Sequence, residues 1–280
     1  MRLSQLLALC RRETGRVPDA ADREAEILVS RVTGIPAGRL FLSMDAETGD
    51  AAEALAPLLA RRAAGEPLQY VLGSWDFYGR EFLLTRDTLI PRPETEGLVE
   101  RALRRRGARV LDVGTGCGAI AVTLAAEAPG IRVVATDVSA AALRVARENA
   151  RRHGVAGRVA FARCDAYSAL KCGDRFDVVV SNPPYVAEGE WSSLPPAVRD
   201  HEPSGALLAG PDGLSVLRRL AEGGGGLLAP GGELWCEIGA DQGAAVAALP
   251  SGPLRFLGVF RDLAGRDRYA GWAKPETERG

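Results

Sequence analysis

The sequence is poor in the residues that bind metals and form disulfides. Its 280 residues include two histidines and five cysteines. The cysteines are scattered, without a Cys-x-x-Cys pair: Cys10, Cys117, Cys164, Cys172 and Cys236. A zinc cluster needs several Cys and His ligands at short spacing, so we predict no metal site. The odd, scattered set also argues against a disulfide framework and indicates a reducing compartment.

The sequence also lacks an excess of either charge and any long apolar run. Lys and Arg number 35 against 36 Asp and Glu, which gives a net charge of -1. Without a basic field over a whole domain, we expect no stable binding to nucleic acid. No stretch of about 18 apolar residues is present, so we expect no membrane span. The apolar run within residues 1–16 is too short for a signal peptide, and we expect a cytoplasmic monomer.

Two zones of different pattern make up the first third of the chain. Residues 1–72 repeat apolar side chains at helical spacing, which predicts a helical domain whose third helix begins near Ser43. This domain either recognises a partner or packs on the rest of the protein. Residues 73–95 are rich in aromatic residues and β-formers and predict a linker with a hairpin of 75–78 against 81–85. Pro91 and Pro93 fix an extended segment after the hairpin.

Residues 96–280 alternate between short apolar strands and helices. We expect strands at 109–113, 132–136, 159–163, 177–181, 233–238, 254–261 and 268–272. This alternation predicts an α/β fold, a parallel sheet with helices on both faces, and ligands bound at the carboxyl ends of its strands. The four glycines 223–226 are interpreted as a flexible turn after a helix at 215–222.

A glycine-rich loop, VLDVGTGCG, occupies residues 110–118 at the end of the first of these strands. Its glycines allow a sharp turn and a close approach of backbone to ligand, but such loops occur in dinucleotide enzymes and methyltransferases alike. Asp137 ends the next strand about 20 residues on, where a carboxylate binds both ribose hydroxyls of an adenosine. Asp112 disfavours a pyrophosphate at the loop and suits the ammonium group of S-adenosylmethionine. It either holds the loop or reaches that ammonium group.

The tetrapeptide Asn182-Pro183-Pro184-Tyr185 follows the very apolar strand expected at 177–181 and is the most specific feature of the chain. Its prolines stiffen the loop. A planar NH2 group needs its hydrogens held by acceptors before its nitrogen attacks a methyl group. The Asn182 oxygen and the Pro183 carbonyl supply two acceptors, and Tyr185 stacks on the planar group. Catalysis would then come from orientation and charge stabilisation, which predicts a methyltransferase acting on an amide or base nitrogen.

Further segments resemble one family. They are EPLQYVLG (66–73), LIPRPETE (89–96), DVGTGCGAIA (112–121), SNPPYV (181–186), the stretch 202–214 and EIG (237–239). Taken in order over nearly the whole chain, they resemble the peptide chain release factor glutamine methyltransferases (the PrmC/HemK family). The PRPETE run is the part that separates this family from DNA methyltransferases.

The resemblance implies a Rossmann-like class I methyltransferase domain over residues 96–280, with a mostly parallel seven-stranded sheet and an antiparallel edge. It implies N5 methylation of the glutamine in the Gly-Gly-Gln loop of class I release factors, with residues 1–72 holding the factor. The cofactor residues would be Asp112, Gly114, Thr115, Gly116, Cys117, Gly118, Asp137, Asp165, Ala166 and Asn182. The glutamine would be held by Asn182, Pro183, Pro184 and Tyr185, of which Asn182, Pro183 and Tyr185 would be catalytic.

Two positions are left with alternatives. Arg92 either lines the mouth of the substrate pocket or pairs with Glu94. Where the family usually has an aromatic residue after the aspartate that ends a strand, this chain reads Asp165-Ala166-Tyr167. Either Tyr167 stacks on the adenine instead of Ala166 or that contact is missing.

Two other functions compete with the leading one. A nucleic acid amino-methyltransferase, acting on adenine N6, cytosine N4 or guanine N2, would use the same tetrapeptide, because a flipped base presents a similar NH2 group. A cofactor-binding protein without turnover would keep the glycine loop alone. The near-neutral charge argues against the first alternative, and the intact Asn182 and Pro183 argue against the second.

Overall fold

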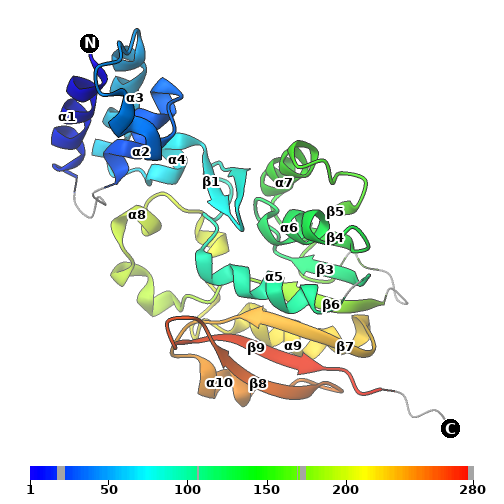
Figure 1. The fold of residues 1–280 in the computed structure, drawn as a ribbon. Coiled ribbons are helices and arrows are strands. Elements are labelled where there is room, and N and C mark those ends of the chain that lie inside the picture. Colours follow the sequence, from blue (N-terminus) through cyan, green and yellow to red (C-terminus); the bar gives the residue numbers. More distant parts are fainter. Residues whose placement is uncertain (18–22, 106, 169, 171–174, 277–280) are drawn as a thin grey trace. The chain divides into compact units, whose positions relative to one another are not determined.

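The computed structural model describes residues 1–17, 23–105, 107–168, 170 and 175–276 (Figure 1). The chain divides into two compact units. The first comprises Met1–Ser74 and Pro195–His201, and the second comprises Trp75–Leu194 and Glu202–Gly280. Among the described residues, no helix has both the length and the apolar character that a membrane crossing requires.

The first unit is helical. Its elements are α1 (Leu3–Thr14), α2 (Glu24–Thr33), the 3-10 helix η1 (Ala37–Ser43), α3 (Ala51–Ala63), α4 (Leu68–Leu72) and α8 (Pro196–Arg199). The apolar stripes of α1, α2 and α3 meet in a core that includes Leu3, Leu6, Leu28 and Leu55. A buried ion pair joins α3 to α2, with Arg62 Nε 2.7 Å from Glu24 Oε2.

The prediction that a helix begins near Ser43 is wrong, because α3 starts at Ala51. The backbone carbonyls of Met44 and Ala46 instead accept hydrogen bonds from the amides of Ser4 and Leu3, at 3.0 and 2.9 Å. Those amides belong to the first turn of α1, which has no partners within its own helix. The segment between η1 and α3 therefore serves as a cap for α1.

The hairpin consists of β1 (Ser74–Phe77) and β2 (Arg80–Leu83), one to two residues earlier than predicted. Its turn residues Tyr78 and Gly79 both have positive φ, 51° and 68°. Two left-handed residues in succession are typical of the tightest hairpin turns, whose twist matches that of the strands. The chain continues through η2 (Pro93–Thr95) into α5 (Glu96–Leu103).

A seven-stranded sheet forms the centre of the second unit (Figure 1). Its strands are β3 (Arg109–Val113), β4 (Arg132–Asp137), β5 (Val159–Arg163), β6 (Phe176–Ser181), β7 (Leu228–Glu237), β8 (Arg255–Arg261) and β9 (Asp267–Ala273). Their spatial order is β5-β4-β3-β6-β7-β9-β8. The pairs among the first five are parallel, whereas β9 pairs antiparallel with β7 and β8. The predicted fold, mostly parallel with an antiparallel edge, is confirmed.

Helices cover the sheet, and short helices lie in its loops. Besides α5, the α-helices are α6 (Ala119–Glu127), α7 (Ala140–Arg152), α9 (Ser215–Leu227) and the short α10 (Gly243–Ala247), and the 3-10 helices η3 (Glu188–Ser193) and η4 (Ser204–Ala206) lie in loops. Leu217 and Leu220 of α9 share a buried core with Val179, Leu234 and Trp272 of the sheet. Helices α5, α6 and α7 contact one another in sequence over other strands.

The interpretation of glycines 223–226 as a flexible turn is wrong, because they form the last turns of α9. A Cβ atom at Gly223 would lie 2.7 Å from the ring of Tyr167, and one at Gly225 would lie 2.5 Å from Pro253. Only glycine allows the helix to approach these rings so closely. Tertiary packing therefore outweighs the low helix propensity of glycine here.

Candidate active site

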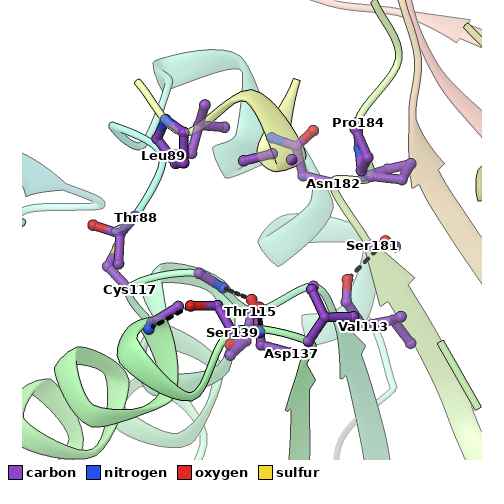
Figure 2. Close-up of a pocket in the computed structure, with 18 of the residues that line it drawn as sticks. Thr88, Leu89, Val113, Thr115, Cys117, Asp137, Ser139, Ser181, Asn182 and Pro184 are labelled. Carbon is purple, nitrogen blue, oxygen red and sulfur yellow. Dashed lines mark hydrogen bonds between the residues drawn. The ribbon is translucent and has the colours of Figure 1, made fainter. Parts of the chain in front are cut away.

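A cavity of about 440 Å³ lies at the carboxyl ends of the parallel strands, in the second unit (Figure 2). The last residues of three neighbouring strands line it: Val113 of β3, Asp137 of β4 and Ser181 of β6. The Ser181 hydroxyl donates to the Val113 carbonyl at 2.7 Å and ties two of these ends together. The volume lies within the range of pockets for small molecules.

The glycine loop presents its backbone to this cavity. The amides of Gly114 and Thr115 both donate to the Thr136 carbonyl of β4 at 2.9 Å, which fixes the loop to the sheet. Gly114 and Gly116 have φ of 73° and 56°, in the left-handed region that favours glycine. A Cβ atom at either position would meet no atom within 4 Å. The space beside both glycines is therefore open to a ligand.

Gly118 differs from the other glycines of the loop, because it does not line the cavity. It is the N-cap of α6, and a Cβ atom there would lie 3.1 Å from the Cβ atom of Ala146 in α7. Gly118 therefore allows α6 to pack closely against α7. Thr115, Gly116 and Cys117 do line the cavity, as does Gly114.

The Asp137 carboxylate lines the cavity in a fixed orientation (Figure 2). Its Oδ2 accepts a hydrogen bond from the amide of Gly116 at 2.9 Å, and its Oδ1 accepts one from the amide of Ser139 at 2.8 Å. Burial raises the pKa of Asp137 above its ordinary value, and these backbone donors oppose that rise. Each oxygen keeps a further lone pair for a ligand hydroxyl.

Asp112 lies beneath the loop and does not line the cavity. It is fully buried, and its Oδ2 accepts a hydrogen bond from the Thr115 hydroxyl at 2.6 Å. Its Oδ1 has no hydrogen-bond partner among the described residues. Burial raises the pKa of Asp112 to about 7. Of the two roles expected for Asp112, the contacts correspond to holding the loop.

The tetrapeptide forms another wall of the cavity. Asn182, Pro183 and Pro184 line it, whereas Tyr185 does not. The Tyr185 carbonyl accepts a hydrogen bond from Gln242 Nε2 at 2.9 Å, and burial raises the pKa of the Tyr185 hydroxyl to about 12. The first three residues thus face a ligand, and Tyr185 is held behind them.

Asn182 is oriented by a chain of side-chain hydrogen bonds that the sequence analysis missed. Its Nδ2 donates to the Thr95 hydroxyl at 3.0 Å, and that hydroxyl donates to Glu237 Oε2 at 2.7 Å. Thr95 and Glu237 stand in the segments LIPRPETE and EIG, which carried the family resemblance without a role. The family resemblance of these two segments was the feature of the sequence that could have pointed to Thr95 and Glu237.

The wall at 164–166 contains Asp165 and Ala166, with no aromatic ring among the described lining residues. Ala166 has a positive φ of 50°. The Tyr167 hydroxyl donates to the Leu220 carbonyl at 2.9 Å, and its ring lies against Gly223 of α9. Tyr167 therefore packs in the core beside α9, so the alternative in which it replaces an adenine-stacking residue is wrong.

Arg92 pairs with Glu202, not with Glu94, and it does not line the cavity. The Glu202 side chain is 1% exposed and also accepts a hydrogen bond from the amide of Ile90 at 3.1 Å. Residues 86–89 and 91 on one side of this contact line the cavity, as do Pro203, 205–206 and 208 on the other. Both expectations for Arg92 are replaced by this clasp between two wall segments.

Two cysteines, Cys117 and Cys164, line the cavity, and the described residues form no metal centre beside them. Cys10, Cys117 and Cys236 are free and buried, Cys164 is buried, and Cys172 lies outside the described residues. Within the same residues, no group of three or more His, Cys, Asp or Glu side chains could hold a metal ion.

Comparison with known proteins places the chain in a family. The family described as PrmC N-terminal domain matches residues 5–73, and the family described as Methyltransferase small domain matches residues 93–195. A release factor glutamine methyltransferase of Cereibacter sphaeroides is 48% identical over 252 residues, which are 89% of this chain and 90% of that protein. The chain belongs to the release factor glutamine methyltransferase family. The expected family and its class of enzyme are confirmed.

Other members of the release factor glutamine methyltransferase family agree with this assignment. Those of Bordetella pertussis and Nitratidesulfovibrio vulgaris are 48% and 44% identical, with 89% and 90% of this chain covered and 93% and 88% of theirs. A solved methyltransferase of Pyrococcus furiosus is similar in fold, with a TM-score of 0.52 at 17% identity over 80% of this chain and 99% of that one. At that identity, the structural likeness shows the fold alone.

Proposed function

We propose that this chain transfers the methyl group of S-adenosylmethionine to the side-chain amide nitrogen N5 of the glutamine in the Gly-Gly-Gln motif of class I release factors. The observation that carries the proposal is the shared cavity. Asn182 and Pro183 line it together with Asp137 and the open glycines of the loop. Acceptors for a planar NH2 group therefore lie beside groups suited to an adenosine.

The residues of the cavity fit S-adenosylmethionine. Asp137 offers a carboxylate that is anchored by backbone amides and keeps lone pairs for the ribose hydroxyls. Gly114 and Gly116 leave open space beside the loop for the bound molecule. Apolar side chains such as Val138 and Val216 line the same cavity and suit an adenine ring. When bound, the cofactor supplies an electrophilic methyl group on a sulfonium.

The residues of the tetrapeptide would prepare the glutamine amide for this transfer. The Asn182 side-chain oxygen and the Pro183 carbonyl would accept hydrogen bonds from its two N–H groups and so fix the plane of the NH2 group, with the nitrogen lone pair, which is perpendicular to that plane, toward the methyl group. One of the two N–H protons would be released to solvent once the N–C bond has formed. These acceptors also stabilise the positive charge that grows on the nitrogen. Pro183 and Pro184 stiffen the loop, so little order is lost on binding. Tyr185, held behind the wall, keeps the loop in place.

We propose that residues 1–72 bind the release factor and that residues 73–95 join them to the catalytic domain at 96–280. The compact first unit and the separate family match over 5–73 support a distinct task for the N-terminal part. We also propose that the enzyme acts as a cytoplasmic monomer without stable binding to nucleic acid. The net charge of -1 and the free thiols of Cys10, Cys117 and Cys236 support this assignment.

The test mixes purified protein and labelled S-adenosylmethionine with a class I release factor, its Gly-Gly-Gln→Gly-Gly-Ala variant, or duplex DNA. We expect label on the loop glutamine alone, located by mass spectrometry of the digested factor. Asn182→Ala should lower the rate at least about 100-fold, because one acceptor of the amide is lost. The exposed Glu222→Ala on α9 is the matched control.

Each outcome of this test has a meaning. Label on DNA alone would replace the release factor by a nucleic acid as substrate. Label nowhere, with cofactor still bound in calorimetry, would refute the enzymatic proposal in favour of a binding protein. Equal rates for Asn182→Ala and the wild type would refute the role of the tetrapeptide.

A further inference from the structure

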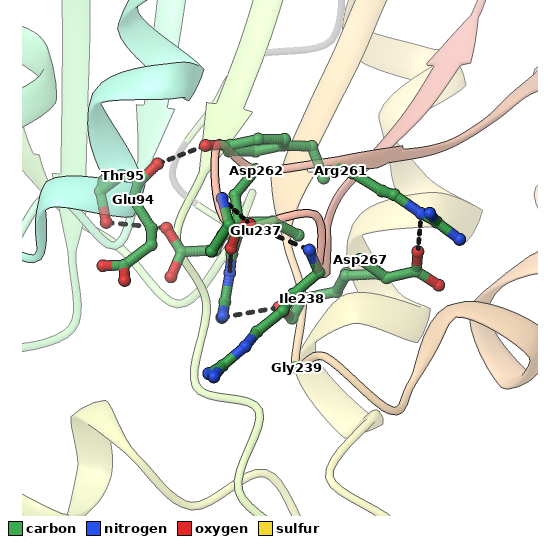
Figure 3. A network of polar contacts seen from close by, with 12 residues as sticks. Glu94, Thr95, Glu237, Ile238, Gly239, Arg261, Asp262 and Asp267 are labelled. Atoms are coloured by element: carbon green, nitrogen blue, oxygen red, sulfur yellow. Dashed lines mark hydrogen bonds and ion pairs between the residues drawn. The ribbon is translucent and has the colours of Figure 1, made fainter.

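A chain of three side chains runs from the cavity into the core of the second unit. Asn182 lines the cavity and donates through Nδ2 to the Thr95 hydroxyl, 3.0 Å away. The Thr95 hydroxyl donates to Glu237 Oε2 at 2.7 Å. Thr95, which also lines the cavity, is 4% exposed and Glu237 is 1% exposed, so the contact between them is largely shielded from bulk water. Figure 3 shows Thr95 and Glu237 within the wider polar network.

The chemistry of these three side chains fixes the direction of the hydrogen bonds between them. An ionised carboxylate only accepts hydrogen bonds, so the single hydroxyl hydrogen of Thr95 must point to Glu237. The Thr95 oxygen then faces Asn182 with a lone pair, which only the NH2 end of the Asn182 amide satisfies. The amide oxygen is left for the cavity, and among the described residues no group donates a hydrogen bond to it.

We propose that Thr95 and Glu237 are positioning residues that hold the Asn182 amide with its oxygen toward the substrate nitrogen. This inference rests on the proposed function, because it assigns the group that sets the polarity of the Asn182 acceptor. Without Glu237 as a fixed acceptor, the amide would turn freely between two orientations. Only one of them presents an acceptor to a substrate N–H group.

The surroundings hold Thr95 rigidly in place. The Tyr269 hydroxyl donates to the Glu94 carbonyl at 2.6 Å, directly before Thr95. A Cβ atom at Gly97 would lie 2.2 Å from the same hydroxyl, so the start of α5 approaches Tyr269 as closely as glycine allows. Thr95 is therefore fixed from η2 and β9, and its hydroxyl has little freedom to seek other partners.

Protonation of Glu237 would allow the hydrogen bonds between Glu237, Thr95 and Asn182 to reverse their direction. Burial is the largest influence on this carboxyl group and raises its pKa to about 7. The charged and titratable groups that act on it come from three segments: Arg92 and Glu94 at the start of η2, Tyr185 of the tetrapeptide, and Arg268 and Tyr269 of β9. Below its pKa the neutral group can donate to Thr95, whose hydroxyl can then donate to the Asn182 oxygen. We therefore expect kcat to fall as the pH falls through about 7.

The test measures kcat and both KM values of Thr95→Val, Thr95→Ser and Glu237→Gln on a release factor, from about pH 6 to about pH 9. Thr95→Val should lower kcat at high pH about 10- to 100-fold, with KM for the cofactor changed by less than about threefold. Thr95→Ser should restore most of the rate. Glu237→Gln should flatten the pH profile near neutrality. Asp112, whose pKa is also raised to about 7, remains intact in that variant and cannot account for the flattening.

Thr123→Val is the matched control, because its buried hydroxyl has no partner among the described residues. The proposal is overturned if Thr95→Val keeps the kcat of this control, or if Glu237→Gln keeps the low-pH fall. If Thr95→Val does not fold, the proposal is still tested by the kcat of Thr95→Ser and by the pH profile of Glu237→Gln. A wild type that does not methylate the factor would refute the proposed function instead, which separates the two failures.

Discussion

The clasp between Arg92 and Glu202 predicts how firmly two walls of the cavity are held. Glu202→Ala removes the partner of the buried Ile90 amide and of the Arg92 guanidinium. An unsatisfied buried amide costs about 1–3 kcal/mol. The Arg92 side chain is 33% exposed, so water replaces much of its lost pairing, which is worth at most about 1 kcal/mol. We therefore expect a destabilisation of about 2–3 kcal/mol.

Glu202→Gln separates the two contributions. The amide oxygen of glutamine still accepts from Ile90, so only the charge is lost and we expect about 1 kcal/mol. Thermal unfolding should show losses of about 4–12 °C for the alanine variant and about 2–4 °C for the glutamine variant. Because both wall segments line the cavity, calorimetry should also show weaker cofactor binding by Glu202→Ala. Equal melting temperatures of Glu202→Ala and the exposed control Glu222→Ala, or equal losses for alanine and glutamine, would refute this account.

Three further predictions address the cavity and the core. Asp137→Ala should weaken cofactor binding at least about tenfold in calorimetry, because charge-assisted hydrogen bonds to the ribose are lost; unchanged affinity would contradict the site. Tyr167→Phe should lower the free energy of unfolding by about 1 kcal/mol through the lost bond to the Leu220 carbonyl, and should leave cofactor affinity unchanged, because Tyr167 does not line the cavity. Gly271→Ala should destabilise by about 1–3 kcal/mol in urea unfolding, because its Cβ atom would lie 2.5 Å from the Trp235 ring; wild-type stability would show that the ring moves aside.

Some of the site was predictable because the chemistry is local in the sequence. The glycines at 114 and 116 and the tetrapeptide at 182–185 each occupy a few consecutive positions at the end of an apolar strand. In a parallel sheet, strand ends meet at one edge, so these segments had to come close. Asp137 could be placed by the same argument. The cavity is lined by residues from all of these segments.

Other assignments failed because they depend on packing between distant segments. Arg92 and Glu202 lie 110 positions apart, and nothing near Arg92 in the sequence favours Glu202 over Glu94. Tyr167 is one residue beyond the cavity wall, yet its ring lies against glycines of α9. Glycines 223–226 form helix although glycine is a poor helix former, and at Gly223 and Gly225 the neighbouring rings of Tyr167 and Pro253 leave no room for a Cβ atom.

The sequence by itself determined the alternation of strands and helices, the order of the motifs and the edge of the sheet at which they gather. These properties follow from the periodicity of side chains along the chain and from the conformational limits of glycine and proline. Only the tertiary structure decided that Thr95 receives Asn182 and donates to Glu237, 142 positions away. The physical reason is that the direction of a buried hydrogen-bond chain depends on which carboxylate lies at its end. That neighbour is set by the order of strands in the sheet and by the loops that cover it, and no local pattern records it.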